Sequence, residues 1–426
     1  MTRAAEDGQA EQTAPVRVVT STSCGAAIST APVVHPGYTP TRGWASVAAV
    51  ALGAFVIVMT ETLPVGLLPQ IADGLSVPLG PAGLIVLVPG FVAAVAAPLF
   101  YLASRSFDRR TLILVLGAAV LVSNAVVAVA PGFILVLVAR MLFGATLGAF
   151  WTVVSPVGPR LVGAAMGTRA VTIIAAGISG GIVVGLPAGQ FLGNLVGWRL
   201  TFAIAAAATV VVVLAQAVVL PRIPAPEMRT RLADLGRITA RPAARFGMAA
   251  GALAFVGQFT AYTYITPFLA DHTRLSSATI SLLYVLYGVA GIVGSIVAGS
   301  LFKRGVMGSF AGSAVLVGAL VVALAVTGTV SWTATVFLTL WGVFWGIVNP
   351  GTLVWLLHAS PDAPEAASAV NVTNLQVALA IGSGLGAVLV SVTTLQALFV
   401  IAGVIIVGSG TLAGVAMRFV RLPSPG

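Results

Sequence analysis

Two ionisable side chains lie inside otherwise apolar stretches of the sequence. Glu61 lies within TETLPVGLLPQIA (60–72), and Arg140 lies within ARMLFGATLGAF (139–150). A charge inside a membrane span is costly and is usually functional. Burial favours the neutral form of a carboxyl group, whereas a nearby guanidinium favours the carboxylate. If the two side chains meet, a conformational change that alters their separation or their access to water would move a proton on or off Glu61.

We therefore interpret Glu61 and Arg140 as a proton-coupling pair. At 1.5 Å per residue, both positions lie roughly 8–12 Å below the same face of the hydrocarbon layer, so contact is geometrically possible. Mutual contact would partly offset the cost of removing each charge from water. The alternatives are a static structural pair, or a Glu61 side chain that simply faces outer water.

Residues for other kinds of chemistry are scarce. The three histidines, His35, His272 and His358, are far apart, and the single cysteine, Cys24, lies in the leading tail. We therefore expect no metal site, no cofactor and no intramolecular disulfide. The spans hold no paired carboxylates, no nucleophile motif and no phosphate-binding glycine loop with its lysine, which disfavours an enzyme and a nucleotide-driven pump.

The elements that carry Glu61 and Arg140 belong in a lipid bilayer. The chain is 58% hydrophobic and 8% charged, whereas a soluble domain carries about 25% charged residues. A spanning helix needs about 20 apolar residues. Twelve runs approach that length, and they are 44–67, 81–103, 111–130, 132–155, 169–192, 199–220, 246–270, 279–301, 306–329, 331–357, 366–392 and 395–418. We therefore predict an all-α integral membrane protein of twelve transmembrane helices.

The runs fall into two groups of six. Residues 44–220 form a predicted N-terminal half, and residues 246–420 form a C-terminal half. The basic linker 221–245 joins them, a tail expected to be disordered (1–43) precedes them, and a short tail (421–426) follows. Two six-helix halves predict an internal repeat, which is the plan of many secondary transporters with the substrate site between the halves.

Basic residues gather in alternate loops. If the N-terminus is cytoplasmic, the outer loops hold only Arg199 and Arg274, and almost all other Lys and Arg residues fall in inner segments. This segregation predicts a multi-pass protein of the cell (inner) membrane with both termini in the cytoplasm. The net charge of +10 therefore reflects the inner loops and does not indicate nucleic-acid binding.

Helix-breaking and small residues interrupt two spans. Pro64 and Pro69 remove backbone hydrogen bonds, so the first span is expected to break beside a cavity or to end there. In the fifth span, Pro187 adds a kink, and glycines recur every four residues, which allows close helix packing. A hinge or a seal between the halves is an additional hypothesis for this stripe. The stripe comprises Gly177, Gly181, Gly185, Gly189 and Gly193.

Polar and aromatic side chains inside the spans are candidates for a substrate cavity. Buried amides need hydrogen-bond partners, which a cavity, a substrate or a neighbouring helix can supply. Interhelical hydrogen bonds and interface aromatics are the alternative for each of these residues. The candidates are Asn124, Trp151, Gln258, Tyr262, Tyr264, Trp341, Trp345, Asn349, Asn371, Asn374 and Gln376.

Four segments resemble a known family over roughly residues 44–420. They are similar to motifs of the major facilitator superfamily, in its 12-span drug:proton antiporter branch, and most of all to sugar-efflux-like (arabinose-efflux-like) and chloramphenicol-resistance-like permeases. The segments are TETLPVGLLPQIA in the first span, ARMLFGATLGAF in the fourth, GLPAGQFLGNLVGWR (185–199) in the fifth and the loop GSLFKRG (299–305).

One segment departs from the pattern of that family. The first-half loop motif usually contains an aspartate followed by arginine, but LASRSFDRR (102–110) has Ser104 at the aspartate position. Arg105, Arg109 and Arg110 remain, and Asp108 is displaced. We expect the charge network between the halves at the inner face to be rebuilt with Asp108 or to be weaker.

The resemblance implies a transporter that exports a small drug-like or sugar-like molecule, driven by proton entry, through alternating access. Its expected partners are a small-molecule substrate, protons and the lipid bilayer, and it is expected to work as a monomer. The alternative is a facilitator or importer of a small metabolite without proton antiport. A receptor or scaffold would not need Glu61 and Arg140 in lipid.

Overall fold

The structure is a computed structural model that describes residues 40–103, 107–154, 157–223, 232–327 and 330–420. All regular elements in these ranges are helices, so the predicted all-α class is confirmed. Most of the predicted tails, together with Ser104 and Arg105, lie outside the described residues. Residues 40–43 already belong to the first helix, which begins at Pro40, because proline is favourable at the first helical position.

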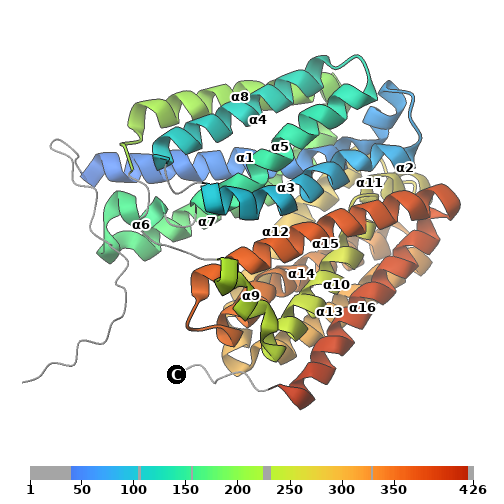
Figure 1. Ribbon diagram of the computed structural model, residues 1–426. Coiled ribbons are helices and arrows are strands. Elements are labelled where there is room, and N and C mark those ends of the chain that lie inside the picture. Colours follow the sequence, from blue (N-terminus) through green and yellow to red (C-terminus); the bar gives the residue numbers. More distant parts are fainter. Residues whose placement is uncertain (1–39, 104–106, 155–156, 224–231, 328–329, 421–426) are drawn as a thin grey trace, which may run out of the picture.

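Six long helices form each half of the molecule (Figure 1). The first half contains α1 (Pro40–Gly74), α2 (Leu79–Ala82), α3 (Leu84–Ala103), α4 (Arg109–Val129), α5 (Phe133–Val154), α6 (Val157–Val162), α7 (Ala164–Val196) and α8 (Trp198–Val219). The second half contains α9 (Leu232–Ala240), α10 (Pro242–Tyr262), α11 (Ile265–Pro267), the π-helical turn η2 (Phe268–His272), α12 (Ser277–Arg304), α13 (Val306–Thr327), α14 (Ser331–Ala359), α15 (Pro364–Val392) and α16 (Leu395–Phe419).

Eleven of the described helices are long and apolar enough to cross a membrane. The predicted span 246–270 is missing from this set, although its helix α10 has 21 residues, as many as α4. This span is one helix only as far as Tyr262, and the chain then continues through α11 and η2. The helix is interrupted at Thr263 and Tyr264, which separate α10 from α11.

The prolines of α1 do not break it. Pro64 and Pro69 both lie inside one helix that continues to Gly74, so the predicted break or helix end at these positions is wrong. Proline lacks an N–H group, and the carbonyl four residues earlier therefore loses its usual helical donor. Membrane helices tolerate this loss where neighbouring side chains satisfy the freed carbonyl, and both freed carbonyls of α1 have such a donor, as described below.

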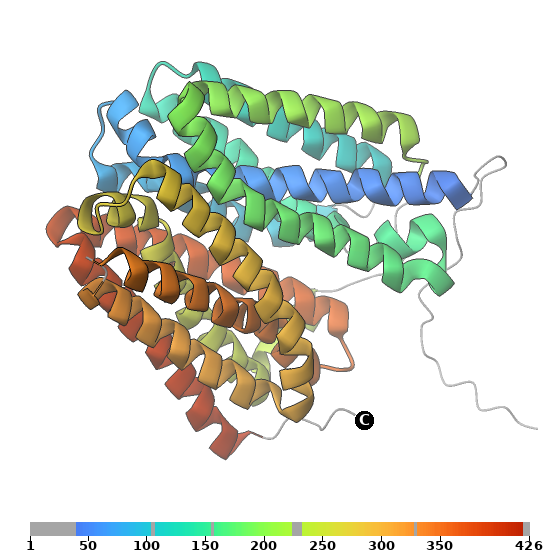
Figure 2. The same ribbon diagram turned by 180° about the vertical axis from the view of Figure 1, so that it is seen from behind.

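The two halves converge at one end of the bundle and diverge at the other (Figures 1 and 2). The helix pairs that join them are α3 with α15, α7 with α12, α2 with α15 and α1 with α11. At the end that carries α2 and α11, here the closed end, the apolar core of the second half extends over first-half residues. These residues are Val65, Leu68, Ala72, Ala82, Val86 and Leu186.

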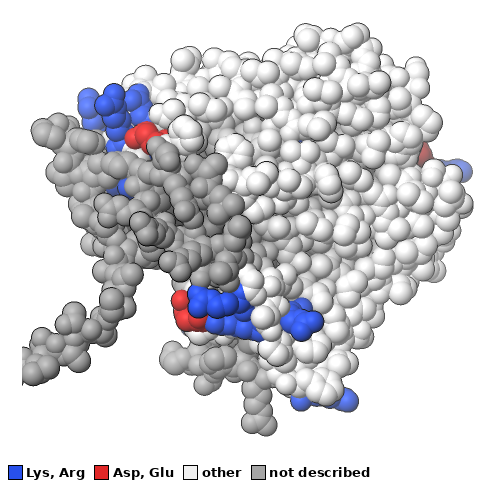
Figure 3. Space-filling view, in the orientation of Figure 1, with Lys and Arg blue, Asp and Glu red and all other residues white. Residues whose placement is uncertain are grey.

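Basic residues lie at the opposite end, here the open end. The helices alternate in direction, so the first residue of α4, the last turn of α12 and the last turn of α16 all lie there. They carry Arg109, the pair Lys303 and Arg304, and Arg418. In Figure 3 most of the visible Lys and Arg side chains lie at this end, and further blue and red atoms lie at the opposite edge. Arg199 and Arg274 belong to the closed end, as the loop pattern predicted.

Part of the predicted linker is an ordered helix that belongs to the second half. Helix α9 packs on α15 and α10, and its Ile238 is buried with Leu356 and Val370. Immediately after α9, Arg241 donates to both carboxylate oxygens of Asp362, at 2.6 and 2.7 Å, and to the carbonyl of Ala359 at 3.2 Å. The linker is therefore fastened to the loop between α14 and α15.

The glycine stripe of α7 faces α1 within the same half. A Cβ atom at Gly177 or Gly181 would collide with the backbone of α1 at Ala51 or Phe55. Gly185, Gly189 and Gly193 meet α1 in the same way further along the helix, and Pro187 lies inside the uninterrupted α7. The stripe thus allows close packing inside the first half, and its role as a hinge remains a prediction. Another face of α7 meets the second half, where Val183 touches Gly288 of α12.

Candidate functional site

Arg140 is fixed in the core of the first half. Its side chain is 1% exposed, and its guanidinium lies over the Phe143 ring, with 4.3 Å from Cζ to the ring centroid. Nε donates to the carbonyl of Ile85 in α3 at 3.4 Å, and one terminal nitrogen donates to the carbonyl of Thr60 in α1 at 3.3 Å. A buried cation needs such acceptors, because water is not available to solvate it.

Prolines explain why those two carbonyls can receive Arg140. Thr60 lies four residues before Pro64, and Ile85 lies four residues before Pro89. Neither proline has an N–H group, so neither carbonyl has its usual helical partner. Two prolines on different helices therefore create the acceptor pair that holds one guanidinium. Pro89 is not among the residues predicted from the sequence, because a single proline in an apolar span does not reveal which side chain will bond the carbonyl it frees.

Glu61 follows Thr60 and is only partly buried. Arg140 and Glu61 interact electrostatically. No ion pair within 4 Å is recorded between these two described side chains, unlike Arg241 and Asp362, whose closest N···O distance is 2.6 Å. The predicted common level of Glu61 and Arg140 is thus reproduced, but a direct ion pair between them is not formed. Arg140 directs donors to backbone carbonyls, which leaves the Glu61 carboxylate available to other partners.

Polar groups with spare hydrogen-bonding capacity surround Glu61. Gln376 of α15 approaches its carboxylate from the second half. The Gln376 side chain is 7% exposed, and its Nε2 has no partner of hydrogen-bond geometry among the described residues. At the preceding residue of α1, the Thr60 hydroxyl accepts from Asn124 of α4 at 3.2 Å, and Asn124 Oδ1 has no described partner. Glu61 therefore lies beside Arg140 of the first half and Gln376 of the second half.

The second half contains a buried amide among aromatic rings. Gln258 of α10 donates to the Tyr287 hydroxyl at 3.0 Å and accepts from the Trp341 indole N–H at 2.8 Å. Tyr262 lies beside Tyr287, with 5.7 Å between ring centroids, and Trp345 lies 5.0 Å from Phe255. Four of the predicted cavity candidates, Gln258, Tyr262, Trp341 and Trp345, are thus brought together. Tyr287 and Phe255 were not predicted, because isolated aromatic residues in an apolar span are not distinctive in the sequence.

Tyr264 lies at the closed end and joins the two halves there. Its hydroxyl donates to the carbonyl of Gly80 in α2 at 3.2 Å, and its ring packs against Gly386 of α15. Two residues later, the Thr266 hydroxyl donates to the carbonyl of Val65 in α1 at 2.9 Å. Val65 lies four residues before Pro69, so a proline again supplies the acceptor.

The remaining cavity candidates are dispersed. Asn374 donates to the carbonyl of Met248 within the second half at 3.0 Å, and Asn371 is buried on the same helix. Asn349 of α14 is half-buried. Trp151 is half-buried in the first half and packs edge-to-face on Phe150, with 5.3 Å between ring centroids. Asn374 and Trp151 thus have packing roles in this arrangement.

The loop motif at the open end stabilises the first half. Asp108 caps α4 by accepting from the Thr111 N–H at 3.1 Å, and it also accepts from the Ile223 N–H at 2.9 Å. Arg110 donates to the carbonyl of Ala217 at 2.7 Å. Burial lowers the pKa of the neighbouring Arg160, and Asp108 opposes that shift. The contacts of Asp108 and Arg110 are thus made within the first half. Ser104 and Arg105 lie outside the described residues.

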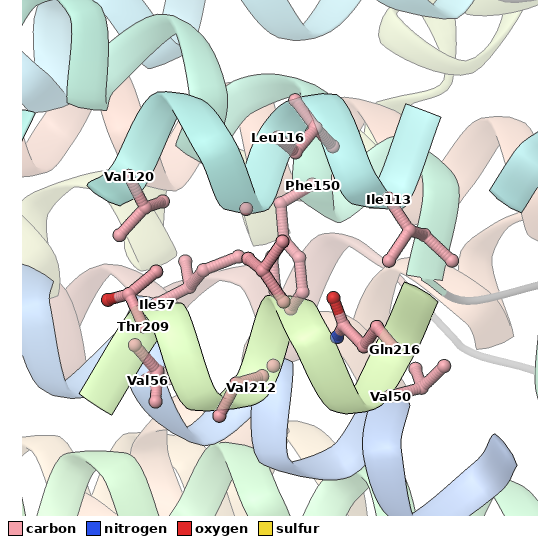
Figure 4. Close-up of a pocket in the computed structure, with 13 residues that line it drawn as sticks. Val50, Val56, Ile57, Ile113, Leu116, Val120, Phe150, Thr209, Val212 and Gln216 are labelled. Atoms are coloured by element: carbon pink, nitrogen blue, oxygen red, sulfur yellow. The ribbon is translucent and has the colours of Figure 1, made fainter. Parts of the chain in front are cut away.

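The enclosed hollow of Figure 4 is too small for a metabolite. It has a volume of about 20 Å³ and lies between α1, α4 and α8, with Gln216 as one of its few polar neighbours. One water molecule needs roughly 10–15 Å³ of such volume. Within the described residues, no group of three or more His, Cys, Asp or Glu side chains is placed to hold a metal ion. A second, more open hollow of about 370 Å³ has an entirely apolar lining that includes Phe91, Val95 and Leu99. The polar groups around Glu61 and Gln258 are therefore the candidate site.

Comparisons with known proteins agree with this architecture. The family model described as Major Facilitator Superfamily matches residues 50–379. The Pseudomonas aeruginosa protein named transcription regulatory protein OpdE is 31% identical over 359 residues, which cover 84% of this chain and 89% of that protein. The Escherichia coli (strain K12) purine ribonucleoside efflux pump NepI is 28% identical over 343 residues, covering 80% and 86%.

Solved structures share the fold at low sequence identity. A bacterial homologue of the human lysosomal transporter Spinster, described as inward-facing and unoccupied, superposes with a TM-score of 0.68 and 16% identity, covering 90% of this chain and 97% of that chain. The human organic anion transporter MFSD10 (TETRAN) superposes with a TM-score of 0.63 and 17% identity, covering 89% and 100%. The chain therefore belongs to the Major Facilitator Superfamily and is a multi-pass membrane transporter, not an enzyme.

Proposed function

We propose that the chain is a proton-coupled exporter of the cell (inner) membrane that works as a monomer by alternating access. The open, basic end faces the cytoplasm, because basic loops are retained there, and the first residue of α1 and the last residue of α16 lie on that side. The observation that carries the proposal is the position of Glu61. Its carboxylate interacts with Arg140 of its own half and is approached by Gln376 of the other half.

Protonation of Glu61 changes the balance between arrangements of the two halves. The carboxylate attracts Arg140 and can accept a hydrogen bond from Gln376, whereas the neutral acid loses the charge attraction. Because hydrogen bonds hold Arg140 to two backbone carbonyls of its own half, that attraction acts from a fixed position. A ligand or a proton can shift a conformational equilibrium only by binding its states unequally, and Glu61 supplies that difference for the proton.

Purine ribonucleosides are the first substrate class to test. NepI, which is 28% identical to this chain, is named a purine ribonucleoside efflux pump, and we propose a nucleoside-like solute here. The drug-like and sugar-like molecules suggested by the sequence motifs remain in the comparison set.

The test is transport by purified protein in liposomes with an imposed pH gradient. Labelled inosine, chloramphenicol and arabinose are compared, and we expect the gradient to drive movement of at least one of them against its concentration. Glu61→Gln is expected to abolish gradient-driven movement. Asp73→Asn removes an exposed carboxylate from the same helix and is expected to leave it unchanged.

Two outcomes would contradict this function. Substrate movement that equilibrates at the same rate with and without the gradient would establish the alternative, a facilitator. Gradient-driven movement that survives Glu61→Gln would remove the proposed role of Glu61, even if the chain exports the solute.

A further inference from the structure

One face of α14 presents Trp341, Trp345 and Asn349 at a spacing of four residues. Side chains four residues apart lie above one another on a helix. Helix α10 packs against this face with Phe255 and Gln258, and Tyr262, one turn further along α10, packs on Tyr287 of α12. The contacts run in register, because Gln258 meets Trp341 and Phe255 meets Trp345.

Burial along this face decreases toward the open end. Trp341 is fully buried, whereas Trp345 and Asn349 are half-buried. Because α14 runs from the closed end to the open end, Trp345 and Asn349 lie nearer than Trp341 to the end where the two halves diverge (Figure 2). The ladder, defined as Trp341, Trp345 and Phe255 with Asn349 at its outer end, thus runs toward the buried amide of Gln258.

The polar atoms at the deep end of the ladder retain hydrogen-bonding capacity. Gln258 uses one N–H toward Tyr287 and one lone pair toward Trp341. A side-chain amide has two N–H donors and two acceptor lone pairs, so one of each remains. The Tyr287 hydroxyl accepts from Gln258 and keeps its own proton to donate. No hydrogen bond to the buried Tyr262 hydroxyl is recorded among the described residues.

We propose that this ladder is the substrate-recognition site and that it binds a planar heteroaromatic ring. Bases stack on aromatic side chains irrespective of sequence, and Trp345 with Phe255 supplies such a surface. An amide recognises a ring edge that presents a donor beside an acceptor, as Gln does with adenine. Gln258, with Tyr287 and Tyr262, supplies that edge-reading group. The inference rests on the proposed export function and assigns recognition of the ring to the second half.

A purely structural role would require the same contacts but no ligand. Gln258 would then only connect α10, α12 and α14, and its replacement would reduce stability without altering which solutes bind. Recognition predicts instead that binding depends on the ring and on its polar edge. The two roles are separated by measuring affinity and thermal stability on the same variants.

The experiment is direct binding of inosine, adenosine and D-ribose to purified, detergent-solubilised full-length protein by titration calorimetry. We expect the nucleosides to bind and ribose not to bind. Trp345→Ala and Gln258→Leu are each expected to raise the nucleoside Kd by about tenfold or more, the scale of one lost stacking or bidentate contact. Trp332→Ala, on the exposed face of the same helix, is the matched control and is expected to leave Kd unchanged.

Two conservative variants keep the experiment informative if Trp345→Ala or Gln258→Leu fails to fold. Tyr262→Phe and Tyr287→Phe remove one hydroxyl each and keep the rings, so a rise in Kd at an unchanged melting temperature supports recognition. Nucleoside affinity that is unchanged in Trp345→Ala and Gln258→Leu would overturn the inference, as would failure of both nucleosides to bind the wild type. Export driven by the pH gradient could persist in either case, and its loss in Glu61→Gln tests the proposed function separately.

Discussion

Arg140 shows how the missing N–H groups of two prolines can position a charge in a low-dielectric interior. Its two backbone acceptors, the carbonyls of Thr60 and Ile85, both lie four residues before a proline. A normal helix would have used both carbonyls internally. Thr266 and Ser295 use the same device, because they donate to the carbonyls of Val65 and Gly346, which precede Pro69 and Pro350 by four residues.

Restoring a backbone donor should therefore disturb Arg140. In Pro64→Ala, the new N–H competes for the Thr60 carbonyl, and Arg140 loses part of its solvation. We expect a decrease of several-fold in gradient-driven transport, with no loss of thermal stability, because alanine favours a helix interior by about 3 kcal/mol relative to proline. Pro98→Ala in α3 is the control, since no described side chain is recorded as a donor to the carbonyl of Ala94. Equal transport by both variants would contradict this role of Pro64.

Gln376 offers a second test at the level of single residues. Gln376→Leu keeps most of the side-chain volume and removes the amide that approaches Glu61 across the interface. We expect weaker proton-coupled transport in liposomes and retained folding, as judged by size-exclusion chromatography. Val377→Ala changes an exposed neighbour on α15 and serves as the control. Wild-type coupling in Gln376→Leu would show that Glu61 acts without a partner from the second half.

At the scale of elements, helices are joined by contacts that the linear pattern does not display. The glycine stripe lets α7 approach α1 at backbone distance, which makes these two helices one unit of the first half. Helix α9 and the residue that follows it attach part of the basic linker to the second half. Ile238 of α9 is buried among second-half residues, and Arg241 pairs with Asp362.

The Arg241–Asp362 pair should not respond to pH in the physiological range. The hydrogen bonds from Arg241 lower the pKa of Asp362 from 3.8 to about 2. A carboxyl group with a depressed pKa contributes its stabilisation above the ordinary value, and this is lost as the pH falls through about 2. Asp362→Asn should therefore lower the melting temperature by a similar, small amount at pH 5 and pH 8.

Differential scanning fluorimetry of wild type and Asp362→Asn at both pH values measures this. The pair is exposed, so the change is expected to be small at either pH. An effect present at pH 8 and absent at pH 5 would show that the pKa of Asp362 is raised above its ordinary value instead of lowered.

At the scale of the whole molecule, the two halves meet through a closed end that combines apolar burial with a few hydrogen bonds. Tyr264 lies in the interruption between α10 and α11, and Thr266 lies in α11, so both can reach α2 and α1 of the first half. Apolar residues of both halves form one core around these bonds. In alternating access, the contacts at this closed end would separate and be replaced by contacts of similar free energy at the open end.

Removing one of these hydrogen bonds should shift the conformational equilibrium. Tyr264→Phe loses the bond to the Gly80 carbonyl, and one hydrogen bond contributes about 0.5–1.5 kcal/mol, or roughly two- to tenfold in an equilibrium constant. We expect a larger population of molecules in which the halves have separated at the closed end. Electron–electron distance measurements detect it between spin labels on the last turn of α1 and the first turn of α12, which both lie at that end. Thr335→Val removes a hydroxyl that bonds only within α14 and is the control. An unchanged distance distribution in Tyr264→Phe would exclude Tyr264 as a contributor to closure.

The sequence by itself determined that lipid is the solvent of this protein, its helical class, most of its spans and the segregation of its basic loops, and it singled out Glu61 and Arg140 as candidates. These properties follow from hydropathy, charge placement and the cost of a charge in lipid, all of which can be read along the chain. Only the tertiary structure decided that Arg140 bonds carbonyls freed by Pro64 and Pro89, that Gln376 approaches Glu61, and that Tyr264 joins the halves. The physical reason is that these contacts depend on which helices pack together, and their partners lie tens to hundreds of residues apart.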